Sequence, residues 1–234
     1  MNKHAWTIAR SRDSTHAEFG AWVFADLAST VKELIPSARD TRITLQDEDA
    51  ILNATVPVGR EDVAVDAVLE ITTANECPPM DPWHEFLVGH CAHVQGWRVK
   101  PTVIFDATRA LERGEQSDAP NVLVFVQRLD GTTPEHFDTN WYKHAGHADG
   151  AEAESEHSRE ERAREEAGHG GLYRQNRVLE AVTPTAWVVH GYTQLQLGML
   201  IPAVPEEPYE RTRGEEPFDR WPPRMVQGPE HRIL

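Results

Sequence analysis

One histidine in the second half of the chain has the neighbours that an acid/base residue needs. His144 follows Phe137 by seven residues and Trp141 by three, so the period of a helix puts all three side chains on one face. Imidazole titrates near neutral pH and burial shifts its pKa, so a histidine between a helix and a sheet can move protons. A core histidine with one ring nitrogen bonded to a carbonyl fits the same position, and the sequence leaves both interpretations open.

A predicted strand over residues 186–197 carries polar side chains on one face. His190, Tyr192 and two glutamines share that face, while Trp187 lies on the other. A face of this composition either meets water or lines a cavity, and the sequence favours neither.

The preceding predicted strand, within residues 172–182, offers Tyr173 and Asn176 as hydrogen-bonding groups. Because side chains alternate along a strand, these two fall on opposite faces. A bulge between them is therefore required, or a site that uses only one of them.

The elements that must position these residues begin with a recognisable unit in the first half. Thr15 and Glu18 form a capping-box pattern at the start of a helix that Pro36 ends. Asp81-Pro82 is typical of an N-cap followed by a proline at the first helical position, so we expect a second helix from about Trp83 to Val94. The predicted strands cover residues 5–10, 42–45, 65–71 and 97–105. The order βαββαβ is the ferredoxin-like pattern.

The second half repeats the start of this pattern. A strand over residues 121–129 precedes Thr133-Pro134, which begins the helix that carries the candidate histidine. Residues 149–167 contain eight acidic and three basic residues, so we expect a solvated segment. From residue 201 onward seven of the 16 prolines fall in the last 34 residues, which predicts an extended tail over the surface and no fourth strand.

The predicted fold class is therefore α+β, with two ferredoxin-like units of which the second is incomplete. The first domain covers residues 1–110, the second covers 120–200 and contains the candidate pocket, and the tail covers 201–234. The first unit has no histidine after its Phe19 and Trp22, so we expect it to serve as a pairing partner.

The composition excludes some classes of function. The chain has 23 Lys and Arg against 38 Asp and Glu, a net charge of −15 that argues against a nucleic-acid partner. It has no apolar run of membrane-spanning length and no leader-like start, so we expect a cytoplasmic protein. Cys77 and Cys91 are too few for a disulfide framework or a zinc set.

Three separated motifs resemble the EthD family of dimeric α/β-barrel proteins. They are the run FDTNWYKHAGHA at 137–148, the run YRQNRVL at 173–179 and the strand start His190-Gly191-Tyr192. The spacing from Trp141 to His144 is one residue shorter than the family pattern. Either His144 or His147 can therefore occupy the position of the family's histidine, and His190 stands where the family has an aspartate.

The resemblance implies a unit whose sheet pairs with a second unit, within the chain or in a homodimer, to form a barrel with a pocket between sheet and helices. It implies a cofactor-independent lyase or isomerase for a small oxygenated aromatic or polyketide-like compound, with no metal. His144 would move the proton, with His147 or His190 as its partner. The substrate contacts would be hydrogen bonds from Tyr173, Asn176 and Tyr192 and apolar contacts from Trp141 and Trp187.

Two other classes of function remain open. The same pocket suits a non-catalytic protein that binds a small molecule. A haem or metal enzyme is the third class, because His84, His90 and His93 fall on the predicted second helix with His90 on its buried face, and His90 and His93 are one turn apart.

Overall fold

The computed structural model describes residues 1–50, 55–58, 61–74, 80–106, 110–128, 173–181, 187–194 and 218–234. The helical segments are α1 (His16–Trp22), the π-helical turn η1 (Val23–Leu27), α2 (Ala28–Leu34) and α3 (Asp81–His90). The strands are β1 (Asn2–Arg10), β2 (Ala38–Leu45), β3 (Thr55–Val58), β4 (Glu61–Ala64), β5 (Ala67–Thr73), β6 (Cys91–Asp106), β7 (Gln116–Arg128), β8 (Tyr173–Ala181), β9 (Trp187–Gln194) and β10 (Phe218–Arg232).

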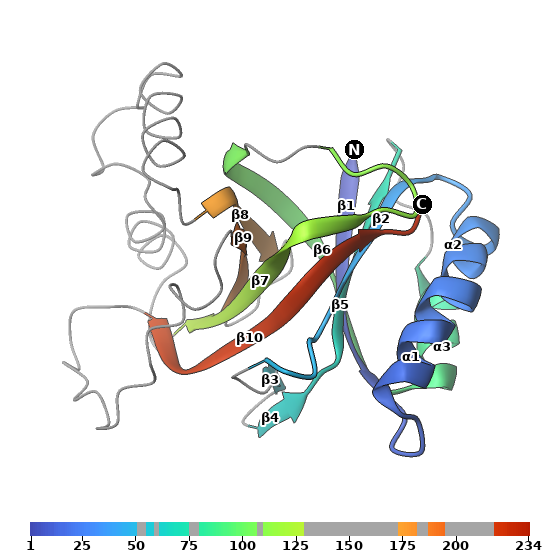
Figure 1. Ribbon diagram of the computed structural model, residues 1–234, viewed down its shortest axis with the longest axis horizontal. Helices are drawn as coiled ribbons and strands as arrows, with labels where there is room; N and C mark the ends of the chain where they lie inside the picture. The colour runs from blue at the N-terminus through green and yellow to red at the C-terminus, as the bar shows by residue number, and fades with distance from the viewer. Residues whose placement is uncertain are drawn as a thin grey trace.

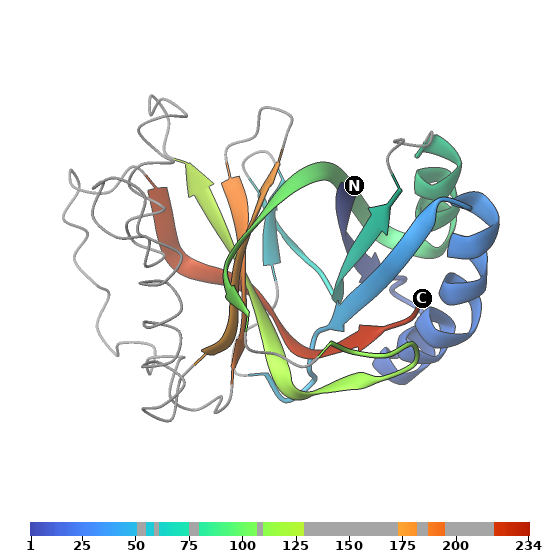
Figure 2. The same cartoon turned by 90° about the horizontal axis from the view of Figure 1, so that it is seen from above.

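The fold is α+β, and its main sheet is an antiparallel closed barrel. The strands follow each other in the order β1-β5-β2-β10-β7-β9-β8-β6, and β6 pairs back to β1 (Figures 1 and 2). Within each half of the chain, the barrel strands occur in the same order, namely fourth, first, third, second. Two seams, β2–β10 and β6–β8, join the halves.

The last strand corrects the expectation of a surface tail. β10 lies inside the barrel wall, paired with β7 on one side and β2 on the other, so the extended-tail prediction is wrong for Phe218–Arg232. Its three prolines are accommodated where the pairing is irregular, because the register shifts between Asp219 and Arg224 and again after Pro229. Proline lacks the N–H that a regular ladder needs, and bulges tolerate it.

The first helix confirms its sequence signals and adds a wide turn. The N–H of Glu18 donates to Thr15 Oγ1 at 3.2 Å, and the N–H of Thr15 donates to Glu18 Oε2 at 2.8 Å. The buried residues of this helix recur every fourth position, slightly more than one α-helical turn. The π-helical turn η1 compensates this drift and keeps all of them against the sheet: Phe19, Val23, Leu27 and Val31.

Two other segments differ from the prediction. α3 begins at Asp81, with Met80 in place of Asp81 as its N-cap, and ends at His90. β6 begins at Cys91 because residues 91–99 pair with β1. The loop expected before β5 contains the two-stranded sheet β3–β4. The predicted helix after Thr133, the acidic segment 149–167 and residues 201–217 lie outside the described residues.

Two apolar clusters occupy the two faces of the barrel wall. The outer core lies between the wall and the helices, which gather beside β1, β2 and β5 in Figure 1. It includes Trp6, Ile8, Phe19, Val23, Leu27, Ile43, Leu69, Ile71, Trp83 and Leu87. The inner core lies on the inside of the barrel wall, with residues from six of its strands, namely Ala5, Val68, Val99, Leu123, Leu179 and Val226, together with Val65.

Gly228 tests the β2–β10 seam, because a Cβ atom at this position would lie 1.8 Å from the carbonyl oxygen of Leu45. We expect Gly228→Ala to lower the free energy of unfolding by at least about 2 kcal/mol, since the backbone cannot yield without opening the seam. Gly89→Ala is the matched control in α3, where a Cβ atom meets nothing within 4 Å, and it should stabilise by up to about 1 kcal/mol. Equal effects of the two variants in urea unfolding would contradict this account.

Candidate functional site

The structure brings together part of the residue set predicted from the sequence. Asn176 on β8 lies directly opposite Tyr192 on β9, and Val178 lies opposite His190. His190 also pairs with Val124 of β7, so these residues occupy the centre of the second half of the wall. His144, His147 and Trp141 lie outside the described residues.

The pairing of β8 and β9 is irregular between Tyr173 and Gln175. Tyr173 and Asn176 can belong to one site only if such an irregularity lies between them. Tyr173 lies opposite Gln194, and the register shifts before Gln175, which lies opposite Thr193. One extra residue on β8 therefore separates Tyr173 from Asn176, and both pair with even-numbered positions of β9. Trp187, at the start of β9, pairs with Gln127 of β7.

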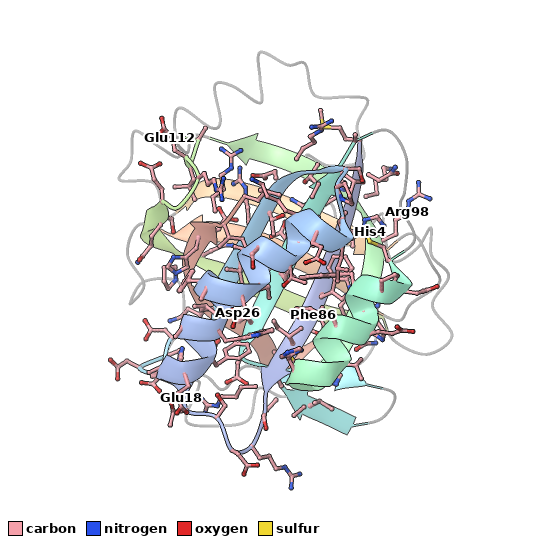
Figure 3. All side chains as sticks on the ribbon, turned by 90° about the vertical axis from the view of Figure 1, so that its right-hand side faces the viewer. His4, Glu18, Asp26, Phe86, Arg98 and Glu112 are labelled. Atoms are coloured by element: carbon pink, nitrogen blue, oxygen red, sulfur yellow. The ribbon has the colours of Figure 1, made fainter. Side chains whose placement is uncertain are left out.

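The corresponding layer in the first half is filled with aromatic rings. Trp83 packs edge-on against Trp6 with ring centroids 6.3 Å apart and stacks on Phe86 at 5.5 Å. Trp22 lies 5.7 Å from Phe19 and 6.1 Å from Phe86. Figure 3 shows Phe86 on α3 beside the α1–α2 helices. This half therefore contributes a packed aromatic layer, and its described part has no histidine equivalent to His144.

The histidines of the metal hypothesis do not gather in the described part of the chain. His84 and His90 are exposed on α3, and His93 lies on β6, so the expected one-turn spacing is wrong. His90 was expected on the buried face, but Trp83 and Leu87 form that face. His90 instead stacks on Trp22 at 5.6 Å, with its Nδ1 2.8 Å from the carbonyl oxygen of Phe86. The described residues contain no group of three or more His, Cys, Asp or Glu that could hold a metal ion.

The inner wall also carries a network of charged side chains that was not predicted from the sequence. Arg42 donates from Nε to Asp40 at 2.8 Å and from Nη1 to Glu230 at 3.2 Å. Arg232 Nε lies 2.8 Å from the second oxygen of Asp40. Because Glu230 and Arg232 belong to β10, this network crosses the β2–β10 seam.

The same wall holds a second ion pair, between Lys3 of β1 and the buried carboxylate of Glu70 on β5. Glu70 lies directly opposite Arg42, so the two groups form one network with three cations and three carboxylates, which balance. Burial alone would lower the pKa of Arg42, but Glu230, Asp40 and Glu70 together raise it. Charges two residues apart in β2 and β10 were the available signal, because that spacing places them on one strand face.

The thiol of Cys91 is a poor candidate for nucleophilic chemistry. Burial, and secondly the charge of Asp66, raise its pKa to about 12. The thiolate is the reactive form, so this side chain is protonated at neutral pH. Cys91 packs at the edge of the outer core instead.

Comparisons with protein-family models, with curated proteins and with solved structures find no match to this chain. None of the described helices is long and apolar enough to cross a membrane.

His4 gives the stability of the fold a dependence on pH. Burial, and secondly the charge of Arg98, lower the pKa of this histidine, which Figure 3 shows beside Arg98. The unfolded chain regains a pKa of about 6.5 and therefore takes up a proton first as the pH falls. The stability that neutral His4 contributes is complete above about pH 6.5 and is lost as the pH falls through the lower folded pKa.

We therefore expect His4→Phe to flatten the rise in unfolding free energy between about pH 5 and 7, measured by urea titration at each pH. His84→Phe is the control, because His84 is exposed on α3. An unchanged slope in His4→Phe would contradict the assignment.

Proposed function

We propose that the chain consists of two ferredoxin-like units that form a barrel of the dimeric α/β type within one polypeptide. The repeated strand order, β6-β1-β5-β2 in the first half and β10-β7-β9-β8 in the second, supports this proposal. Both seams join strands of the same chain, so closure requires no second copy. The homodimer that the family resemblance implies would then form through another surface.

We propose that the second half acts as a cofactor-independent lyase or isomerase on a small oxygenated aromatic or polyketide-like compound. The observation that carries the proposal is the register that sets Asn176 opposite Tyr192, with His190 two residues away. Val189, the residue before His190, pairs with Leu179 of the inner core and therefore lies on the inner face. The two-residue period then assigns positions 190 and 192 to the outer face.

The outer face of the second half would form one wall of a pocket if helices covered it as they cover the outer face of the first half. In the first half, α1, α2 and α3 cover the outer face of the wall. A helix after Thr133 would cover the second half in the same way and would bring His144 and His147 over His190 and Tyr192. The sequence resemblance to EthD proteins supports the same arrangement.

The proposed chemistry is proton transfer next to a carbonyl group. One ring nitrogen of His144 or His147 takes a proton from the carbon beside the substrate carbonyl, and the electron pair moves to the carbonyl oxygen as an enolate. The Asn176 amide and the Tyr192 hydroxyl would donate to this oxygen, which stabilises the charge that develops there. Return of the proton to another carbon completes an isomerisation, and its delivery to a leaving hydroxyl releases water.

The test begins with a thermal-shift screen of hydroxylated aromatics and aromatic lactones on the full chain, followed by turnover assays on each hit. Positioned acid/base groups contribute about 10²–10⁴-fold, so we expect His144→Gln or His147→Gln to lower kcat by that factor with an unchanged Tm. Asn176→Ala and Tyr192→Phe should lower kcat/KM. Thr193→Val is the matched control, because this neighbour alternates with Tyr192 and pairs with the buried Asn121 of the inner wall.

Retention of full turnover by the His144, His147 and His190 variants would rule out the histidine mechanism. Binding of a hit without turnover, weakened by the same substitutions, would assign the chain to the non-catalytic binding class instead.

A further inference from the structure

On the inner wall of the first half, three polar atoms of the described residues are buried with neither a hydrogen-bond partner nor an ion pair. They are Thr7 Oγ1 on β1 and Gln95 Oε1 and His93 Nε2 on β6. Thr7 is completely buried, while Gln95 and His93 are half-buried. We call these three residues the lumen cluster.

The strand register places the lumen cluster on the inner face. Thr7 lies opposite Val68, a residue of the inner core, and opposite Gln95 on its other side. His93 lies opposite Ala9, one strand repeat from Gln95. Directly opposite residues of an antiparallel pair, such as Thr7 and Gln95, have Cβ atoms about 4.5–5.5 Å apart. His93 is the diagonal neighbour of Thr7, at about 7–8 Å, so one small molecule can reach all three groups.

The neighbouring side chains supply no hydrogen-bond partner to the three atoms of the lumen cluster. Its neighbours on β1 are Ala5 and Ala9, which are small and offer no polar side chain. A buried polar atom without a partner costs about 1–3 kcal/mol, and the costs of three such atoms add. Proteins accept such a cost where a bound group supplies the missing hydrogen bonds.

The polar chemistry of the lumen cluster selects the ligand. The amide oxygen of Gln95 is an acceptor, the Thr7 hydroxyl donates or accepts, and burial lowers the pKa of His93 so that its ring is neutral. A neutral molecule with two donors and one acceptor on adjacent atoms meets these groups, and a primary carboxamide has this pattern. Trp97, two residues beyond Gln95, packs against the inner core and offers an apolar surface for the rest of the molecule.

We propose that the lumen cluster of Thr7, Gln95 and His93 binds a small neutral molecule that carries a primary carboxamide next to an apolar group. This site lies on the inner wall of the first half, apart from the proposed active site on the outer face of the second half. It does not depend on that proposed function.

The probe is benzamide, titrated into the full chain by isothermal calorimetry and by backbone amide shifts in NMR. N,N-dimethylbenzamide is the matched ligand, because it keeps the ring and the carbonyl but has no N–H donor. We expect benzamide to bind at least about tenfold more tightly than the dimethyl compound, and to shift the amides of residues 7, 93 and 95.

Two variants separate the lumen cluster from other binding surfaces. Thr7→Val and Gln95→Leu each remove one polar group at similar volume, and each should weaken benzamide binding by about tenfold. Because each removes an unsatisfied buried group, neither should lower the Tm of the free protein. Lys100→Gln, on the exposed face of β6, is the control and should bind benzamide like the wild type.

The proposal fails if benzamide does not bind at millimolar concentration, which would leave these atoms to ordered water alone. It also fails if both benzamides bind equally, or if both Thr7→Val and Gln95→Leu keep the wild-type affinity.

Discussion

Closure of the sheet at the β2–β10 seam is the constraint on which the rest of the molecule depends. The last strand must run beside β2, although more than 180 residues separate Arg42 from its partner Glu230. Two features make this possible: Gly228 lets the β10 backbone touch Leu45, and the charges of β2 and β10 neutralise each other across the seam. A partly buried charge that loses its partner is destabilising, so the network favours this register over alternatives.

Closure divides every strand into an inner and an outer face with different tasks. The inner face of the first half holds most of the ion network, which continues across the seam into β10, together with the small residues of β1 and the lumen cluster. Its outer face is packed with aromatic rings under the helices. The second half puts Asn176 opposite Tyr192 on a wall built in the same strand order. In the proposed function, the first half supplies a packed outer layer and the second half would supply polar groups to a substrate.

Much of the first half could be predicted from local signals, because its caps and stripes are short-range. The capping box at Thr15, the helix that begins near Asp81, and the buried stripe through Phe19 and Val31 are all present. The end of α3 was misplaced, since pairing of residues 91–99 with β1 is a long-range effect that helical periodicity does not contain.

The larger error, the surface tail, has the same origin. Proline density argues against a strand only if the ladder is regular, and the prolines of β10 fall where its register shifts. Alternation along β8 left two possibilities, a bulge between Tyr173 and Asn176 or a site that uses only one of them. Only the pairing with β9 shows that the bulge is present. The ion network was missed because its members come from four strands that only closure brings together.

Hydrogen exchange of the backbone amides of residues 224–232 tests the closed barrel most directly. We predict protection in β10 within the range measured for β5, because residues 224–231 pair with β7 and residues 230–232 also pair with β2. β5 is paired with β1 and β2, and both strands open only with the barrel. Exchange of these amides at the rate of a free peptide would contradict closure, and with it the seam, the inner wall and the placement of both proposed sites.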